Sequence, residues 1–260
     1  MPKIVPENRS VLDQRGLHLY HAGWSNCSMR VRMTLAEKGL PWTSHHLDTR
    51  KGEHITSEYF GIHPNGLVPA LVHDGDVWIE SSDIIRYLDD VFPEPRLTPR
   101  SDIGREQLSA WIELASEIHV DAVKTYIYGA TQQTRRRKTA AELRRYRKLQ
   151  TNDELLAFHT RTASEEGITA EERRSAEQLL HTAFSRLGAQ LSTQRWLAGD
   201  DFSLADIVWV PLHYTLERAG FSFDRHTNVK NWARAIATRP SFQTAVVQWF
   251  DGPPAKFRPN

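Results

Sequence analysis

A serine, a cysteine and a second serine lie close together at Ser25, Cys27 and Ser28, where the sequence predicts the first turn of a helix. Free N–H groups and the positive end of the helix dipole point outward from such a turn. A thiol bound against them would be stabilised as its thiolate, as in low-pKa cysteines. These residues therefore indicate nucleophilic sulfur chemistry, although Ser25 could instead serve only as the N-cap of the helix.

Two further groups of residues could bind a small peptide. Pro69 directly precedes a predicted strand, and a cis bond before it would turn the Val68 backbone outward for another extended chain. Glu80 and Ser81 lie between a strand and a helix, where N–H groups favour an anion and the Glu80 carboxylate favours an ammonium. A zwitterionic amino-acid end would suit both groups. The alternatives are an ordinary proline at a strand start and simple capping of the helix.

These residues need a framework of strands and helices to bring them together. Residues 1–16 are polar, contain two prolines and are predicted to form a flexible extension. From 17 to 93 the order β-α-β-α-β-β-α predicts a small mixed sheet flanked by helices. Strands are expected at 17–20, 42–47, 70–72 and 77–79, and helices at 27–38, 53–60 and 81–91. Asp74 and Gly75 suit the positive φ of a type I′ hairpin turn between the last two strands.

The second half of the chain is predicted to be helical. Prolines at positions 95 and 99 indicate a linker over 94–101, followed by an all-α domain over 102–260. Helices are expected at 102–129, 139–163, 170–191 and 203–218, with two shorter segments reaching residue 249. Ser203 and Asp206 have the spacing of a capping box. We expect this motif to fold the second domain and to perform no chemistry.

Composition narrows the function classes. The 260 residues carry a net charge of +1, which gives no indication of an acidic partner such as nucleic acid. Cys27 is the only cysteine, which excludes an internal disulfide and a cysteine-rich zinc site. The 12 histidines are scattered, so no metal is expected. The sequence shows neither a signal peptide nor an apolar stretch of membrane length, which favours a cytoplasmic protein without a membrane partner.

One strongly basic segment stands out from this balance. Residues 135–148 hold eight basic residues against the single acidic residue Glu142. We expect a solvated helix face or loop. The alternatives are contact with nucleic acid, or a position at the border of a substrate entrance where the segment would favour anionic substrates.

Five segments occur in the order and spacing of one known superfamily. They are the turn at Ser25, residues 51–54 (Lys-Gly-Glu-His), residues 65–71 (Asn-Gly-Leu-Val-Pro-Ala-Leu), Glu80-Ser81 and the capping box at Ser203. Over about residues 17–250 the sequence resembles the cytosolic glutathione transferases. The resemblance implies a thioredoxin-like α/β domain that binds glutathione over 17–93, and an all-α domain that contributes the second-substrate pocket. It also implies a homodimer.

The resemblance assigns roles to matching positions. Ser25 matches the residue whose hydroxyl donates to the glutathione sulfur. The Val68 backbone would pair with the cysteinyl part of glutathione, and Pro69 would be the cis proline. Glu80 and Ser81 would hold the γ-glutamyl ammonium and carboxylate.

The resemblance implies fewer polar contacts for the glycyl end of glutathione. His54 resembles the histidine that contacts the glycyl carboxylate in the theta and phi classes. Leu67 departs from those classes, which often place Gln or Lys before the Val-Pro pair. We therefore expect one polar contact to the glycyl end to be missing.

The turn itself resembles the zeta class, which includes maleylacetoacetate isomerase and a reductive dehalogenase. Asn26 and Met29 replace the zeta Ser and Trp, and Glu80 replaces the usual Gln. Residues 51–91 are more similar to the theta class and the bacterial β-etherases. The chain is therefore interpreted as a divergent bacterial-type transferase.

Position 25 bears on the reaction type. The omega class carries a cysteine there, which forms a mixed disulfide with glutathione, whereas this chain carries Ser25. Serine favours activation of the bound thiol over thiol exchange. Cys27 matches a residue that is catalytic in the dehalogenase and is elsewhere a small packing residue, so its role stays open.

The resulting hypothesis is a glutathione-dependent transferase whose activated thiolate attacks a small, hydrophobic, aromatic electrophile. Glutathione is expected as cosubstrate, without a metal. Alternatives are β-aryl-ether cleavage, reductive dehalogenation, cis–trans isomerisation, and a non-catalytic glutathione-fold binding protein. Four residues of the first long helix are candidates for the second-substrate pocket, the alternative being ordinary core packing: Trp111, His119, Tyr126 and Tyr128.

Overall fold

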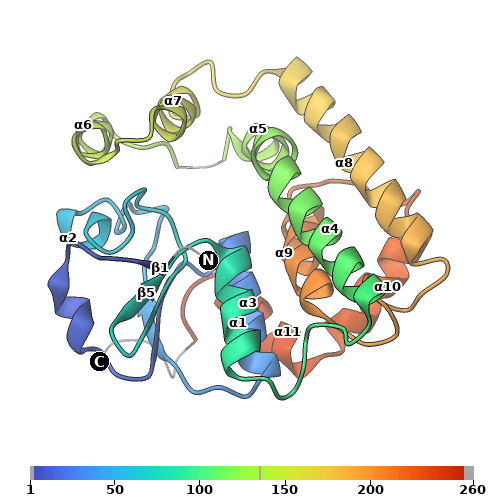
Figure 1. The fold of residues 1–260 in the computed structure, drawn as a ribbon. Helices are drawn as coiled ribbons and strands as arrows, with labels where there is room; N and C mark the ends of the chain where they lie inside the picture. The colour runs from blue at the N-terminus through green and yellow to red at the C-terminus, as the bar shows by residue number, and fades with distance from the viewer. Residues whose placement is uncertain (1–2, 135, 255–260) are drawn as a thin grey trace.

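A computed structural model of the chain describes residues 3–134 and 136–254. A small sheet with helices on its faces forms one part, and a larger group of helices forms the other (Figure 1). This arrangement confirms the predicted thioredoxin-like α/β domain followed by an all-α domain.

The sheet has five strands, in the order β1-β5-β4-β2-β3. β2 (Leu17–His21) pairs in parallel with β3 (Thr43–His46) and antiparallel with β4 (Ala70–His73), which pairs antiparallel with β5 (Asp76–Trp78). Alternate residues of β2 are buried, as expected for a strand in a sheet covered by helices. Asp74 and Gly75 have φ values of 52° and 87°, as the predicted hairpin turn requires.

The N-terminal segment differs from the predicted flexible extension. β1 (Lys3–Ile4) pairs antiparallel with β5 at the edge of the sheet. A short 3₁₀ turn, η1 (Arg9–Asp13), then places the side chain of Val11 in a hydrophobic cluster with only 1% of its surface exposed. The prediction of a flexible extension is therefore wrong. The sequence did not indicate β1, because a two-residue strand is too short to show an alternating pattern.

Three helices accompany the sheet. α1 (Asn26–Glu37) and α3 (Ser81–Val91) match the predicted ranges closely. α2 (Ser57–Phe60) is shorter than predicted, because Thr56 caps it by accepting a hydrogen bond from the Tyr59 N–H. Residues 51–54 form turns instead of helix.

The helical part begins with α4 (Asp102–Ile118), which passes through a π-helical segment, η2 (His119–Lys124), into α5 (Thr125–Thr131). The predicted helix over 139–163 is divided into α6 (Ala140–Leu149) and α7 (Asp153–Arg161). Asn152 makes the break, because its side chain accepts from the Leu155 N–H as the N-cap of α7. The remaining elements are α8 (Ala170–Gln190), α9 (Leu204–Arg218), α10 (Thr227–Ala237), α11 (Pro240–Ala245) and the short η3 (Val247–Trp249).

The capping box at the start of α9 is confirmed. Ser203 accepts at the helix start, and the Asp206 carboxylate accepts in return from the Ser203 N–H at 3.0 Å. Asp206 is fully buried and also accepts from the indole N–H of Trp232 at 2.8 Å. The motif therefore fixes the start of the most deeply buried part of the helical domain.

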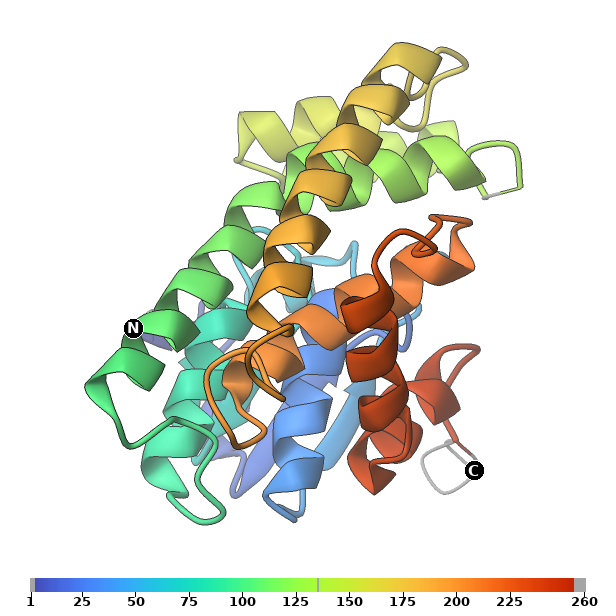
Figure 2. The same cartoon turned by 90° about the vertical axis from the view of Figure 1, so that its right-hand side faces the viewer.

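The two parts share one hydrophobic core. α1 packs against α3, α9 and α11, so it lies between the sheet and the helical domain (Figure 2). The core contains Met29 and Leu35 of α1 together with Trp209 of α9 and Val246. The first turn of α1 is consequently held on both sides. Across residues 3–134 and 136–254, no helix is long and apolar enough to cross a membrane.

Candidate active site

Cys27 lies in the first turn of α1, half-buried, and its sulfur is 3.9 Å from Nε2 of His119 on η2. Burial raises the pKa of the Cys27 thiol, but the nearby His119 and Arg30 outweigh it and lower the pKa to about 5. The helix N-terminus acts in the same direction. This balance of charges favours the thiolate form of Cys27 at neutral pH.

Arg30 links α1 to α3 beside this cysteine. It is 2% exposed; its Nη1 donates to Oγ of Ser81 at 3.3 Å, and its Nε donates to the Val208 carbonyl at 3.2 Å. Its Nη2 is buried and finds no hydrogen-bond partner among the described residues. A buried guanidinium with a spare donor favours an anion as its neighbour.

Sequence reasoning assigned no role to Arg30. The available signal was its position three residues after Cys27, which places both on one helix face.

Glu80 and Ser81 form the start of α3, as predicted. Glu80 has a φ of 63°, a conformation that favours glycine, and its side chain makes no capping hydrogen bond within the described part of the chain. A strained residue at a helix start is typical of functional sites. Ser81 is buried and accepts from Arg30, and its side-chain hydrogen bond to Cys27 is one of the influences that lower the pKa of that thiol.

Lys124 adds a cation that the sequence analysis did not identify. Burial lowers its pKa, whereas the negative charges of Cys27 and Glu80 raise it. Burial also raises the pKa of Glu80, with the Cys27 thiolate adding to the effect. The π-helical geometry of η2 places Lys124 on the same face as His119, five residues earlier. The centre around Cys27 thus combines anions and cations from α1, α3 and η2.

The Val68–Pro69 peptide bond is cis, as predicted. Val68 is half-buried, and its backbone makes no hydrogen bond to another backbone group of the described residues. Ala70, which follows Pro69, pairs with Tyr20 of β2, the strand that leads into the Ser25 turn. An extended peptide could therefore pair with Val68 beside the start of α1.

Ser25 caps the start of α1, which is the structural role considered for it above. Its Oγ accepts from the Ser28 N–H at 3.3 Å, so it is the N-cap of α1. Accepting uses a lone pair and leaves the hydroxyl proton available. Capping and donation to a bound sulfur are therefore compatible.

His54 lies apart from Cys27, in the turns before α2. Burial lowers its pKa to about 4, and Lys138 and Arg145 add to this effect. Its Nδ1 is buried without a hydrogen-bond partner among the described residues. His54 is therefore neutral at physiological pH and faces cations from the helical domain.

The four predicted second-substrate residues separate into two groups. His119 lies at the candidate centre, and Tyr128 is half-buried with its ring 5.4 Å from that of Phe158. Trp111 and Tyr126 are 8% and 4% exposed and belong to the core of the helical domain, so their prediction is corrected. They face inward because α4 and α5 pack against α8 and α9.

Comparison with known proteins identifies the family. The sequence model described as "Glutathione S-transferase, N-terminal domain" matches residues 24–91, and that described as "Glutathione S-transferase, C-terminal domain" matches residues 155–240. Glutathione S-transferase Z2 of Arabidopsis thaliana is 30% identical over 235 residues, covering 90% of this chain and 92% of that protein. The chain belongs to the glutathione transferase superfamily.

The likeness within the superfamily extends to the bacterial branch. Protein LigF of Sphingobium sp. is 29% identical over 249 residues, covering 87% of this chain and 91% of LigF. The crystal structure of beta-etherase LigF from strain SYK-6 matches with a TM-score of 0.77 at 26% identity, covering 88% of this chain and 98% of that one. Relatives of both zeta and β-etherase kinds agree with the mixed resemblance seen in the sequence.

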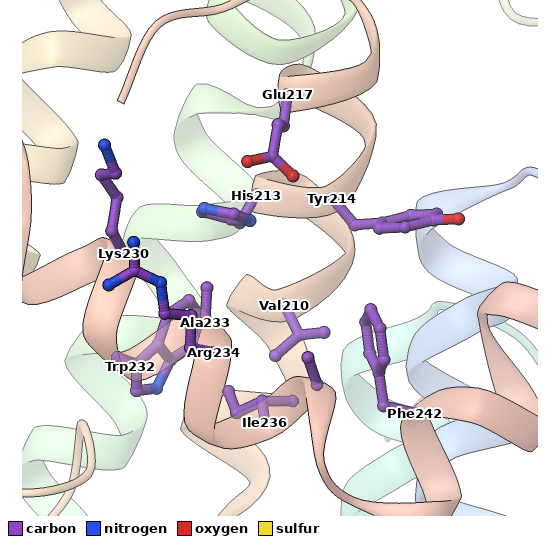
Figure 3. A pocket seen from close by; sticks show the side chains of 11 residues that line it. Val210, His213, Tyr214, Glu217, Lys230, Trp232, Ala233, Arg234, Ile236 and Phe242 are labelled. Atoms are coloured by element: carbon purple, nitrogen blue, oxygen red, sulfur yellow. The ribbon is translucent and has the colours of Figure 1, made fainter. Parts of the chain in front are cut away.

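The protein also has a pocket away from Cys27, of about 260 Å³, between α9, α10 and α11 (Figure 3). Burial lowers the pKa of His213 in its wall to about 4. No residue predicted for glutathione or the second substrate lines this pocket. The lining residues are Val210, His213, Tyr214, Glu217, Lys230, Trp232, Ala233, Arg234, Ile236, Ala237 and Phe242.

No group of three or more His, Cys, Asp or Glu side chains within the described ranges could hold a metal ion.

Proposed function

We propose that the protein is a glutathione S-transferase that joins the glutathione sulfur to a small, hydrophobic, aromatic electrophile. One observation carries the proposal: three groups lie next to the ends of adjacent strands of one sheet. The hydroxyl of Ser25 follows β2, the Val68 backbone, unpaired among the described residues, precedes β4, and the Glu80–Ser81 helix start follows β5. Each offers a group that one part of glutathione requires. A non-catalytic binding protein could cap α1 with another residue and need not keep a hydroxyl that can donate to a bound sulfur.

The reaction follows from these groups. The γ-glutamyl ammonium binds Glu80, and its carboxylate binds the Ser81 hydroxyl and the N-terminus of α3. The thiol loses its proton to solvent, and the Ser25 hydroxyl donates to the resulting thiolate. The sulfur then attacks an electrophilic carbon, and the leaving group departs with the bonding electron pair. His119 and Tyr128 stand on the helical elements where the second substrate would bind.

The depressed pKa of Cys27 favours a second candidate, reductive removal of a substituent. The Cys27 thiolate would attack the sulfur of a glutathionyl-aryl intermediate. The aryl carbon would leave with the C–S electron pair and take up a proton, and a mixed disulfide between Cys27 and glutathione would remain. A second glutathione thiolate would release Cys27 and form glutathione disulfide, so two thiols supply the electrons.

One panel of assays separates these reactions. The protein is mixed with glutathione and, in turn, an aryl halide, an aryl ether and maleylpyruvate, and products are identified by mass spectrometry. For conjugation, Ser25→Ala should leave glutathione affinity nearly unchanged and raise the pKa of the bound thiol, seen by thiolate absorbance. Loss of turnover in Cys27→Ala, with Ser25→Ala active, would instead favour the reductive route. No product from any substrate, despite glutathione binding, would indicate a binding protein.

The superfamily resemblance also leads us to propose a homodimer that works in the cytoplasm. Light scattering on the purified protein should give a mass twice that of the 29.9 kDa chain. A mass of one chain at micromolar concentration would contradict the dimer.

A further inference from the structure

The turn that joins β2 to α1 has its backbone groups held by neighbouring elements. The Ala22 N–H donates to Oγ of Ser28 at 3.2 Å, and the Gly23 N–H donates to Nε2 of His46 on β3 at 3.3 Å. The Ala22 carbonyl accepts from the Ser25 N–H at 3.4 Å, which ties the turn directly to the candidate thiol activator. Ala22 and Gly23 are both buried. The position of Ser25 therefore depends on how this turn is held.

Arg32 on α1 holds the carbonyl groups of the same turn, and it is only 1% exposed. Its Nη1 donates to the Ala22 carbonyl at 2.9 Å, and its Nη2 donates to the Gly23 carbonyl at 2.6 Å. Its Nε donates to the Ala245 carbonyl at the end of α11, at 2.7 Å. A planar guanidinium fixes several acceptors at set angles, which a single ammonium does not. Arg32 thus joins the turn to the C-terminal part of the chain.

Arg32 is a buried cation whose four hydrogen-bond partners are neutral groups. The fourth bond runs from its Nη1 to Nδ1 of His21 at 3.1 Å. Because arginine can only donate, His21 accepts at Nδ1 and carries its proton on Nε2, which donates to Oγ of Ser44 at 2.9 Å. Burial and the charge of Arg32 lower the pKa of His21, so this ring stays neutral. Burial lowers the pKa of Arg32 to about 9, so Arg32 is a cation at neutral pH. The carbonyls of the turn therefore help to compensate a buried charge.

The short element η3 packs against the same turn. A Cβ added to Gly23 would lie 2.0 Å from the carbonyl oxygen of Trp249, so the two backbones are in direct contact. The Trp249 ring meets that of His21 edge-on, with centroids 4.6 Å apart, and Cζ of Arg32 lies 5.4 Å from the centroid of the Trp249 ring. Trp249 is 1% exposed. A side chain at position 23 would therefore force the turn and η3 apart.

We propose that Arg32 is a positioning residue for the hydroxyl of Ser25, and that η3 braces the turn through Gly23. The inference rests on the proposed function, in which this hydroxyl donates to the glutathione thiolate. A hydrogen bond weakens steeply as its angle departs from the optimum, so a donor fixed in advance stabilises the thiolate more than a mobile one. Arg32 is buried and acts through the two carbonyls of the turn that it orients. The C-terminal segment thereby contributes to thiol activation in the other domain.

The pKa of the thiol of bound glutathione tests this role, and no electrophile is needed. The thiolate absorbance is titrated in difference spectra with and without glutathione, so that the signal of Cys27 cancels. In Gly23→Ala and in Arg32→Lys this pKa should rise by about 1 unit or more, which is about a tenfold fall in the ionisation constant. Titration calorimetry at pH 5, where the glutathione thiol is protonated, should give the wild-type affinity for glutathione in both variants.

Lys38→Met is the matched control. Lys38 is another buried cation of the α1 region whose ammonium donates to carbonyls, those of Phe92 and Pro95, but it lies at the opposite end of the helix from the turn. Its loss should destabilise the fold and leave the pKa of bound glutathione unchanged. Circular dichroism at the assay temperature establishes that each variant is folded. Should Arg32→Lys not fold, Gly23→Ala, which retains Arg32, decides alone.

The outcomes separate the positioning role from the proposed function. A wild-type pKa of the bound thiol in either folded variant, Gly23→Ala or Arg32→Lys, would overturn the positioning role and leave the transferase proposal intact. An equal rise in Lys38→Met would do the same, because the effect would then follow from general destabilisation. A wild-type complex whose thiol titrates at about 8.5, the value of a free thiol, would overturn the proposed function and with it the role of Arg32.

Discussion

Cys27 is the only cysteine of the chain, so its ionisation can be followed without a competing thiol. Alkylation by iodoacetamide requires the thiolate, so the wild-type rate should be half-maximal near pH 5, where the pKa of Cys27 lies. In His119→Gln the largest favourable influence on the thiolate is removed, and the midpoint should move upward by about 1 to 3 pH units. Mass spectrometry of the alkylated protein measures both rates.

A remote histidine provides the control for this experiment. His73 lies at the end of β4 next to Leu17, opposite the end of the sheet that leads to Cys27. His73→Gln should leave the midpoint of Cys27 alkylation unchanged. A wild-type midpoint near 8.5, the value of a free thiol, would contradict the charged centre described around Cys27.

The sequence correctly places Ser25 and Ser81 at helix starts, because such starts are encoded by neighbouring residues. Arg30 and Lys124 differ. Arg30 is held by the Val208 carbonyl, 178 positions away, and Lys124 belongs to a π-helical turn that ordinary helix periodicity does not predict. Trp111 was predicted to line the pocket and lies in the core instead. An aromatic residue on an amphipathic helix can face either place. Tertiary packing, absent from local pattern, decides each of these cases.

At the scale of elements, the start of α9 is encoded by neighbouring residues, whereas the position of α6 is set by tertiary packing. Four adjacent letters specify the capping box at Ser203, and the helix begins there as predicted. The division of residues 139–163 into two helices follows from the cap at Asn152. The docking of α6 on α2 instead depends on Gln150 and Tyr146 finding partners at Asn65 and Phe60. Such contacts between distant segments leave no periodic trace. The two-residue β1 is missed for the same reason, since it is defined only by β5.

The start of α9 allows a stability prediction. In Ser203→Ala one capping acceptor is lost, and the free energy of unfolding should fall by about 0.5–2 kcal/mol. Asp206→Ala should cost more, roughly 3 kcal/mol or above, because buried N–H donors of Leu197, Ser203 and Trp232 all lose their acceptor. Urea denaturation measures both values. The exposed control Asp201→Ala should stay within about 0.5 kcal/mol of the wild type. Equal losses in Ser203→Ala and Asp206→Ala would refute the role given to Asp206.

At the scale of the whole molecule, the shared core joins the two parts into one unit. Residues of α1 and α9 belong to the same hydrophobic cluster, and Arg32 on α1 donates from its Nε to the Ala245 carbonyl at 2.7 Å. Removing the helical domain would therefore expose one whole side of α1. Two domains that share a core should unfold together, although multidomain proteins often do not.

A buried ion pair at the junction makes this cooperativity testable. Nζ of Lys38, at the end of α1, lies 2.6 Å from Oδ1 of Asp89 on α3, and both side chains are almost completely buried. Lys38 also donates to the Phe92 and Pro95 carbonyls, and Asp89 accepts from the Leu97 N–H at 3.0 Å. The pair thus holds the segment that connects the two parts.

Lys38→Met leaves the Asp89 carboxylate buried without its cation, which should lower the free energy of unfolding by about 3–5 kcal/mol. The matched control is Lys3→Met, which removes the cation of the Lys3–Asp76 pair; both partners are 51% exposed, so the loss should stay below about 1 kcal/mol. Hydrogen exchange in rising urea, followed on peptides from α3 and α9, should show both helices opening at the same concentration in each variant. Separate midpoints for α3 and α9, or similar losses in the two variants, would mean that the junction does not couple the domains. The expected result is a common midpoint for α3 and α9 that is shifted only in Lys38→Met. The free energy of unfolding that keeps α1 and Cys27 in place would then come from both domains together.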